Sequence, residues 1–206
     1  MPEDTNALVV AAFDFDGTIT YHDSFIPFLW FISKKTRFIT ESAHLLPKLL
    51  AFKLGRISNI TTKEAFITAF LKGKRMEEIR ISGKKFARTV IPRFIRHEMM
   101  TRIAWHKKQG HICVLISASF DFYLATWAKD NGFDMVLSSQ LEVDPCGKIT
   151  GKLLGCNCYG AEKVRKLNEW LGDRAVEYLY VYGDSRGDLE LLARANEKYF
   201  RGKKLT

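Results

Sequence analysis

Residues 8–18 read LVVAAFDFDGT, and this stretch decides how the rest of the chain is interpreted. Its first six residues form a continuous apolar run, which predicts a strand buried on both faces, as in a parallel sheet. The run ends at Asp14 and Asp16, which flank Phe15. Because side chains alternate along an extended chain, the two carboxylates leave the strand in similar directions. Such a pair can supply a nucleophile and a proton donor.

Two later apolar runs also end in polar residues. HICVLI (111–116) ends at Ser117, and YLYVY (178–182) ends at Gly183 and Asp184. Helical patterns lie between these runs, at 120–131 and 161–171. Strands that alternate with helices predict an α/β fold, here a doubly wound, Rossmann-like parallel sheet. Polar residues at the carboxyl ends of such strands converge on one crevice.

The interval 21–100 interrupts this alternation, because it contains helical patterns and no clear strand. The expected helices are 24–32, 37–54, 61–71 and one long helix over 76–107. We therefore expect a catalytic core formed by 1–20 and 101–206, with an inserted helical cap at 21–100. Further along, 136–143 and 150–154 are expected to form two strands around a turn.

Charge is distributed unevenly between these parts. The whole chain of 206 residues has a formal charge of +9, yet residues 21–100 contain 16 Lys or Arg and 6 Asp or Glu. The remaining residues are close to neutral, with 16 basic and 17 acidic side chains. The excess indicates either an ordinary solvated helical face or a cationic lid over an anionic ligand. A phosphorylated metabolite, a nucleic acid or a membrane surface would be attracted to it.

The composition excludes a disordered or collagen-like chain, since 47% of the residues are hydrophobic and 27% are charged. The four cysteines show no CxxC spacing and are expected to be reduced. The acidic start MPEDTNALVV does not resemble a secretory signal, and no apolar stretch reaches 18 residues. We expect a cytoplasmic protein, with contact at the inner face of a membrane left open.

Several further residues suit the chemistry of a bound phosphate. Gly17 would let backbone N–H groups approach an anion, and Thr18 adds a donor. Ser117 offers a hydroxyl and Ala118 a nearby amide, although Ser117 or Ser119 could simply cap the next helix. Lys163 would neutralise phosphate charge, although lysines at such positions are common on surfaces.

The second acidic pair, Asp184 and Asp188, lies four residues apart directly after a predicted strand. Carboxylates in this arrangement can hold or support a hard cation such as Mg²⁺, which prefers oxygen ligands. The Arg-Gly-Asp sequence within this segment is not expected to act in adhesion, because no secretion signal is expected.

The order of these motifs resembles the haloacid dehalogenase-like (HAD) hydrolase superfamily. The chain has DFDGT (14–18), then an apolar run with Ser117, then Lys163, and finally GDSRGD (183–188). A helical insertion between the first two motifs is similar to the C1-capped subfamily IB. That group includes phosphoserine phosphatases and the C-type phosphatidylglycerophosphate phosphatases. The segments TGKLLGCNCYGAEKVRKL and DSFIPFLWF are also similar to this group.

The resemblance implies a role for each matching residue. Asp14 would attack phosphorus and form an aspartyl-phosphate, and Asp16 would protonate the leaving oxygen and then activate water. Lys163 would neutralise the charge of Asp14 and of the phosphoryl group, and Ser117 would hold a phosphate oxygen. Mg²⁺ would be bound by Asp14, the carbonyl of Asp16 and Asp184, supported from behind by Asp188.

The substrate is less constrained by the sequence. Asp23 could contact the amine of phosphoserine, as an acidic residue does in phosphoserine phosphatases, or it could cap the first cap helix. Arg37 and Arg56 are candidates for a carboxylate contact. The apolar and basic segments FIPFLWFI and LLPKLLAFKLG instead favour a lipid headgroup at a membrane surface, unless their apolar residues are packed in the cap.

We therefore expect a Mg²⁺-dependent phosphomonoester hydrolase acting on phosphoserine or a related small metabolite. The alternatives are a phosphatidylglycerophosphate phosphatase at the membrane surface, or a non-catalytic module that binds an anion or a nucleic acid. A nucleic acid is not the expected partner, because no recognised motif for it is present.

Overall fold

The computed structural model describes residues 7–205, and a six-stranded sheet forms its centre. The order of the strands is β3-β2-β1-β6-β7-β8, and all neighbours are parallel except β7 and β8. The strands are β1 (Leu8–Phe13), β2 (Ile112–Phe120), β3 (Met135–Ser139), β6 (Val176–Gly183), β7 (Glu197–Phe200) and β8 (Lys203–Leu205). The strand order confirms the predicted doubly wound α/β fold.

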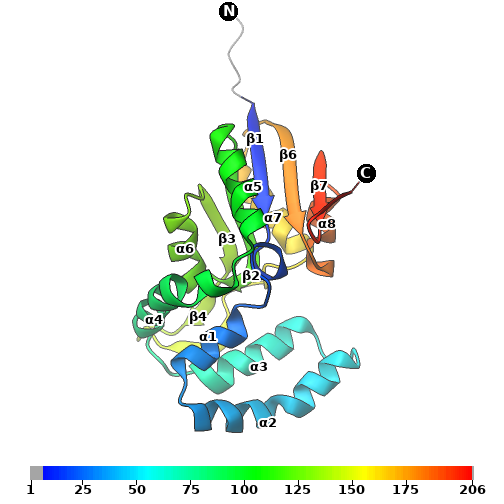
Figure 1. The fold of residues 1–206 in the computed structure, drawn as a ribbon. Helices are drawn as coiled ribbons and strands as arrows, with labels where there is room; N and C mark the ends of the chain where they lie inside the picture. The colour runs from blue at the N-terminus through cyan, green and yellow to red at the C-terminus, as the bar shows by residue number, and fades with distance from the viewer. Residues whose placement is uncertain (1–6, 206) are drawn as a thin grey trace, which may run out of the picture.

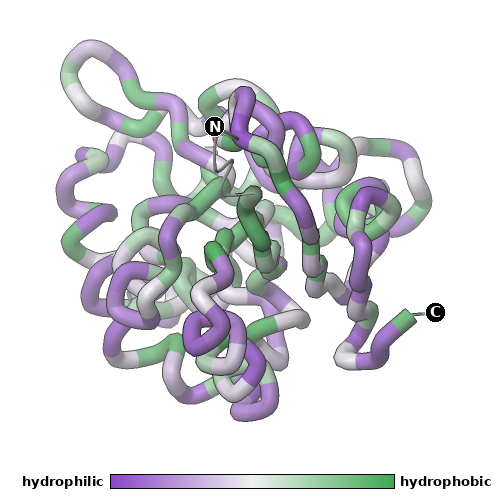
Figure 2. The backbone as a smooth tube through the Cα atoms, turned by 90° about the horizontal axis from the view of Figure 1, so that it is seen from above, coloured by the Kyte–Doolittle hydropathy of each residue, from purple (hydrophilic) through white to green (hydrophobic). Residues whose placement is uncertain are grey.

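Helices cover both faces of this sheet, as the fold requires (Figure 1). The covering helices are α5 (His97–Lys108), α6 (Asp121–Asp130), α7 (Ala161–Leu171) and α8 (Leu189–Leu192). In β1, Ala11 and Phe13 join the apolar cluster that includes residues of α5 and α6, whereas Val10 and Ala12 join the cluster with α7 and α8. Seen from above, the backbone in the middle of the molecule is mostly hydrophobic, whereas hydrophobic and hydrophilic residues alternate along the surrounding segments (Figure 2).

Three helices form a layer at the carboxyl ends of β1 and β6 (Figure 1). They are α1 (Phe25–Ile32), α2 (Lys35–Lys53) and α3 (Asn59–Leu71). Thr20 lies before α1 and Ile95 lies before α5, and these two residues pair with each other. By contrast, α4 (Met76–Thr89) packs along α6 of the core. The boundaries of the cap at residues 21 and 100 stay a prediction.

The expectation of one long helix over 76–107 is wrong. The chain instead forms α4, a short helical turn at Ile91–Phe94 and then α5. Pro92 lies in this turn, and proline lacks the N–H that a continuous helix would need.

The expected pair of strands after residue 135 is only partly correct. The first part, β3, joins the central sheet beside β2, and only β4 (Leu141–Val143) pairs with β5 (Ile149–Leu153) as an antiparallel hairpin. The short strands β7 and β8 were not expected, because their sequences are mostly polar. Among residues 7–205, no helix has both the length and the apolar character needed to cross a bilayer.

Candidate active site

Asp14 and Lys163 form a buried ion pair at the carboxyl end of β1. Asp14 directly follows that strand, and Lys163 lies in the first turn of α7. The Lys163 Nζ lies 2.6 Å from Asp14 Oδ1 and 2.6 Å from Asp188 Oδ1. Burial alone would lower the pKa of Lys163, but the two carboxylates raise it above its ordinary value. The sequence alternative of a surface lysine is therefore wrong, since Lys163 is only 2% exposed.

Asp188 holds the loop that follows β6. Its Oδ2 accepts hydrogen bonds from the backbone N–H groups of Asp184 and Ser185 and from the Ser185 hydroxyl. Lys163 lowers the pKa of Asp188 below its usual range despite burial. Both oxygens of Asp188 thus have donors, which suits a residue that orients its neighbours rather than one that reacts.

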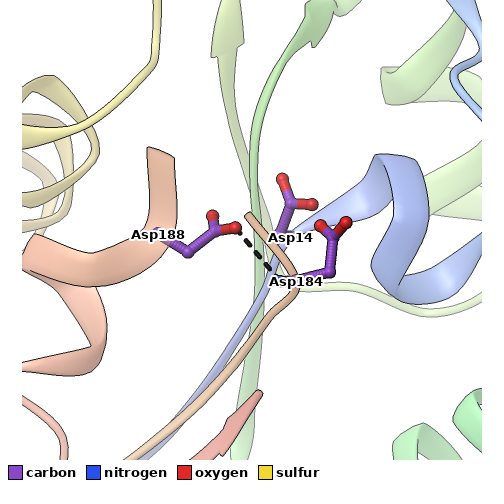
Figure 3. Close-up of side chains that lie close together, drawn as sticks. All are labelled: Asp14, Asp184 and Asp188. Carbon is purple, nitrogen blue, oxygen red and sulfur yellow. Dashed lines mark hydrogen bonds between the residues drawn. The ribbon is translucent and has the colours of Figure 1, made fainter. Parts of the chain in front are cut away.

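The carboxylates of Asp14, Asp184 and Asp188 converge from separate segments of the chain (Figure 3). Each offers an oxygen, and these oxygens all lie within 4.8 Å of one another. Burial raises the pKa of Asp14 to about 7, although the Lys163 ammonium opposes the rise. One lysine does not balance three carboxylates, and the donor set consists of oxygen alone. These residues therefore fit a hard divalent cation such as Mg²⁺.

Asp16 is held from two sides. Its Oδ1 accepts a hydrogen bond of 2.8 Å from the backbone N–H of Ser24, and its Oδ2 accepts one from the Ser119 hydroxyl. Burial, followed by the charge of Asp23, raises the pKa of Asp16 to about 8. A carboxyl group with such a pKa carries a proton at neutral pH, as a general acid must. The alternative that Ser117 or Ser119 caps the next helix is wrong, because the N-cap position of α6 is Phe120 and, among residues 7–205, no side chain caps this helix.

A pocket of about 270 Å³ opens above Asp14. Of the residues expected from the sequence, it is lined by Asp14, Asp16, Asp23, Ser117, Ala118 and Lys163. The remaining lining is largely apolar and aromatic, and much of it comes from the α1–α3 layer: Phe25, Ile26, Phe52 and Phe66. Side chains that are far apart in sequence thus meet in one open pocket at the carboxyl ends of the strands.

Four expected residues lie beside this pocket rather than in its wall. Gly17, Thr18 and Asp184 line a neighbouring cavity, and Asp188 is buried behind Lys163. The Thr18 hydroxyl donates to Asp184 Oδ1 at 3.3 Å. The Gly17 N–H donates to the Thr20 hydroxyl at 3.3 Å. The expected role of Gly17 and Thr18 in holding phosphate stays a prediction.

Lys63 of α3 was missed by the sequence analysis. It lines the pocket, donates to the Ala118 carbonyl, and lies 3.0 Å from Asn157 Oδ1. Burial lowers the pKa of Lys63 to about 8, although Asp23 and Asp16 oppose the decrease. Residues 21–100 contain 16 lysines and arginines, and nothing in the sequence around Lys63 distinguishes it from the others. Its tertiary neighbours alone distinguish it.

Asp23 caps a helix and also lies at the pocket, so its position is compatible with both of the roles that the sequence left open. Its Oδ1 accepts hydrogen bonds from the N–H groups of Phe25 and Ile26, which caps α1. It also lines the pocket. Arg37 and Arg56, the candidates for a contact with a substrate carboxylate, are not among the residues that line the pocket. Arg37 instead donates a hydrogen bond to the carbonyl of Ala69 in α3.

A family model for haloacid dehalogenase-like hydrolases matches residues 11–193. The chain belongs to this family, and the resemblance inferred from its motifs is confirmed.

Two curated relatives extend over nearly the whole chain. Protein CicA of Caulobacter vibrioides is 35% identical over 199 residues, which cover 95% of this chain and 88% of the relative. Histidinol-phosphatase of Neisseria meningitidis is 25% identical over 197 residues, which cover 91% and 87%.

Two solved structures share the fold. A protein of unknown function from Bordetella pertussis matches with a TM-score of 0.78 and 21% identity, covering 93% of this chain and 89% of that one. A phospho-aspartyl intermediate analogue of phosphoserine phosphatase matches with a TM-score of 0.65 and 17% identity, covering 93% and 85%. The family model and the match to histidinol-phosphatase support assignment of this chain to the phosphoric monoester hydrolases, whereas the two solved structures show the shared fold.

Proposed function

We propose that this hydrolase cleaves phosphate monoesters of small metabolites that carry both an amine and an acidic group, with phosphoserine as the first candidate. One observation carries the proposal: the pocket above Asp14 contains Asp23 and Lys63, two side chains of opposite charge. Asp23 would bind an ammonium group, and Lys63 would bind a carboxylate. Histidinol phosphate and phosphoserine, the substrates in the names of two matched proteins, both carry an amine.

The first chemical step is an attack of Asp14 on phosphorus. A bond forms between the Asp14 carboxylate and phosphorus, and the bond from phosphorus to the ester oxygen breaks. The proton of Asp16 passes to that oxygen, so the alcohol leaves neutral. Ser24 and Ser119 keep the Asp16 carboxyl in place for this transfer.

The second step returns the enzyme to its starting state. Asp16, now ionised, takes a proton from water, and the water oxygen bonds to phosphorus as the bond to Asp14 breaks. Lys163 offsets negative charge near Asp14 throughout, and Ser117, which lines the pocket, would donate to a phosphate oxygen. A Mg²⁺ ion held by Asp14, Asp184 and the Asp16 carbonyl would reduce the repulsion between carboxylate and phosphate.

Within the family, a helical layer inserted between the first two motifs supports placement in subfamily IB. We propose that α1, α2 and α3 form the cap, since they lie at the carboxyl ends of the strands and supply much of the pocket wall. In this proposal α4 belongs to the core, against α6. A cytoplasmic location is also part of the proposal.

A second candidate is a phosphatidylglycerophosphate phosphatase. It is favoured by the aromatic and apolar lining, which includes Phe25, Phe52 and Phe66. A lipid headgroup would leave Lys63 and Asp23 without the paired charges that phosphoserine offers. The third alternative, a non-catalytic module, is disfavoured because the chain is a hydrolase of this family with Asp14, Asp16, Lys163 and Asp184 all assembled.

Phosphate release by the purified protein with Mg²⁺ tests the proposal. We expect phosphoserine to be preferred over phosphoethanolamine, which lacks the carboxylate, and over 3-phosphoglycerate, which lacks the amine. Asp14→Asn should lower turnover by at least about 10³-fold while phosphoserine still binds. Preferred hydrolysis of phosphatidylglycerophosphate in mixed micelles would contradict the proposed substrate. Binding without hydrolysis of any ester would contradict the enzyme assignment.

A further inference from the structure

One side of α2 exposes a continuous row of apolar side chains. The row consists of Ile39, Ala43, Leu46, Leu50 and Leu54, here called the outer stripe. Its members are spaced by three or four residues, so they share one face of the helix. Its four large side chains are between 59% and 63% exposed. Phe38, Leu45 and Leu49 of the same helix pack into the core instead.

The outer stripe lies in a basic segment. Residues 34–56 contain six lysines or arginines and one acid, Glu41. Within residues 7–205, none of the six cations takes part in an ion pair. Lys35 lies four residues before Ile39, and Lys53 lies between Leu50 and Leu54, so both lysines are at the margin of this helix face. An apolar row with lysines at its margins is the pattern of a helix that lies in the surface of an anionic bilayer.

An apolar groove continues this surface at the amino end of α2. Trp30, Phe31 and Phe38 line the groove, together with the cations Lys35 and Arg93. Trp30 is 45% exposed, and indole rings are favoured at the boundary between headgroups and acyl chains. At the other end of α2, Phe52 lines the catalytic pocket. Docking through α2 would therefore place the pocket close to the membrane surface.

We infer that the outer stripe and its lysines dock this protein on an anionic lipid bilayer. A second copy of the chain is a poorer partner for this face. Its own α2 would bring six further cations and one acid against the first six, and an antiparallel pair would place Lys35 near Lys53 of the other copy. The inference concerns where the enzyme acts, and it holds for a soluble as well as for a lipid substrate.

Sedimentation with vesicles tests this docking. The full chain should bind phosphatidylcholine vesicles that contain phosphatidylglycerol, and bind pure phosphatidylcholine weakly. Leu46→Ser/Leu50→Ser should weaken binding about tenfold or more. The matched control Ile81→Ser/Val143→Ser changes exposed apolar residues elsewhere and should bind as the wild type does.

A second pair of variants tests the position of the charge, because both variants lower the net charge by the same amount, from +9 to +5. Lys35→Glu/Lys53→Glu should also weaken binding about tenfold or more, whereas Lys84→Glu/Lys85→Glu on α4 should have a much smaller effect. All four variants should hydrolyse p-nitrophenyl phosphate at the wild-type rate if they are folded, and circular dichroism confirms folding independently of activity. Vesicle binding is measured without turnover, so failure of the proposed function would not be confused with failure of docking.

Three results would overturn the inference. The first is an absence of binding to anionic vesicles by the wild type. The second is an equal loss in the α2 and control variants, which would indicate diffuse attraction by the whole charged surface. The third is a wild-type dimer in light scattering that Leu46→Ser/Leu50→Ser dissociates, with no vesicle binding, which would assign the stripe to a second copy of the chain.

Discussion

Gly17 lies where the loop after β1 passes closest to the second acidic segment. Its φ is +82°, a conformation that side chains with a Cβ rarely adopt. A Cβ at this position would lie 2.2 Å from Asp184 Oδ2. The absence of a side chain therefore allows the Asp14 and Asp184 segments to approach each other. This steric role is supported directly by the geometry, whereas an anion-binding role is not.

Gly17→Ala is expected to destabilise the fold by about 1–3 kcal/mol and to reduce turnover, because backbone strain and the clash displace Asp184. Gly55→Ala is the matched control, since Gly55 has a φ of +70° but nothing within 4 Å of a new Cβ. It should cost about 1 kcal/mol and leave turnover unchanged. Urea unfolding and phosphate release measure both effects. Equal behaviour of the two variants would show that the contact with Asp184 is unimportant.

Asp184 should make the stability of the protein depend on Mg²⁺. An ion that binds only the folded state raises the free energy of unfolding by roughly 2–3 kcal/mol when it is about a hundredfold above its dissociation constant. We expect this gain in the wild type and its loss in Asp184→Asn. The gain should persist in Asp173→Asn, which changes an exposed acid elsewhere. A thermal melt with and without EDTA measures it, and an undiminished gain in Asp184→Asn would exclude this site.

At the scale of elements, α1 links the cap to the catalytic loop. Asp23 caps the helix through Oδ1. The next residue, Ser24, donates its N–H to Asp16, and its hydroxyl lies 3.2 Å from that of Ser119 and 3.0 Å from that of Tyr123. The start of one helix thus positions the Asp16 carboxyl group and at the same time brings the acidic side chain of Asp23 to the pocket.

Two substitutions separate the roles of Asp23. Asparagine caps helices about as well as aspartate, so Asp23→Asn should keep the stability of α1 and lose only the charge. We expect Asp23→Asn to raise the KM for phosphoserine about tenfold and to leave that for 3-phosphoglycerate unchanged. Asp23→Ala should in addition lose about 1 kcal/mol of stability. An unchanged KM for phosphoserine in Asp23→Asn would leave capping as the role of this residue.

At the scale of the whole molecule, a buried histidine connects α5 to the sheet. His106 lies 2.8 Å from His111, nitrogen to nitrogen, and 2.8 Å from the Tyr182 hydroxyl. Burial, together with the charges of His111 and Arg102, lowers the pKa of His106 to about 4, while Glu197 opposes the decrease. Between pH 6.5 and 4, His106 is therefore neutral in the folded protein, whereas it binds a proton in the unfolded chain.

The free energy of unfolding should consequently decrease as the pH falls from about 6.5 towards 4. The contribution of His106 is on the order of 3 kcal/mol across this window, and it is fully present above pH 6.5. His106→Gln should have a lower stability at pH 7 but a flatter profile. The exposed His44→Gln is the control and should reproduce the wild-type slope. Urea titrations at several pH values measure the free energy of unfolding. The same dependence on pH in His106→Gln and in the wild type would refute the assignment of this effect to His106.

The sequence by itself determined the parallel α/β core, because runs such as 8–13 and 178–182 are long, apolar and end in acids. It also singled out Asp14, Asp16 and Lys163, which line one pocket in the structure, and their catalytic roles stay a prediction. The polar strands β7 and β8 and the break at Pro92 were not found, because pairing with an existing sheet edge and a local turn outweigh weak sequence preferences.

Only the tertiary structure decided which basic residue of the cap enters the site. Lys63 is distinguished by its burial above Asp16 and Asp23, and by its contacts with Ala118 and Asn157 from distant parts of the chain. The same holds for the outer stripe. Apolar residues at helical spacing predict a buried face, and only packing shows which face of α2 the cap core covers and which remains exposed. Local patterns specify elements, whereas burial and neighbouring charges depend on how those elements pack.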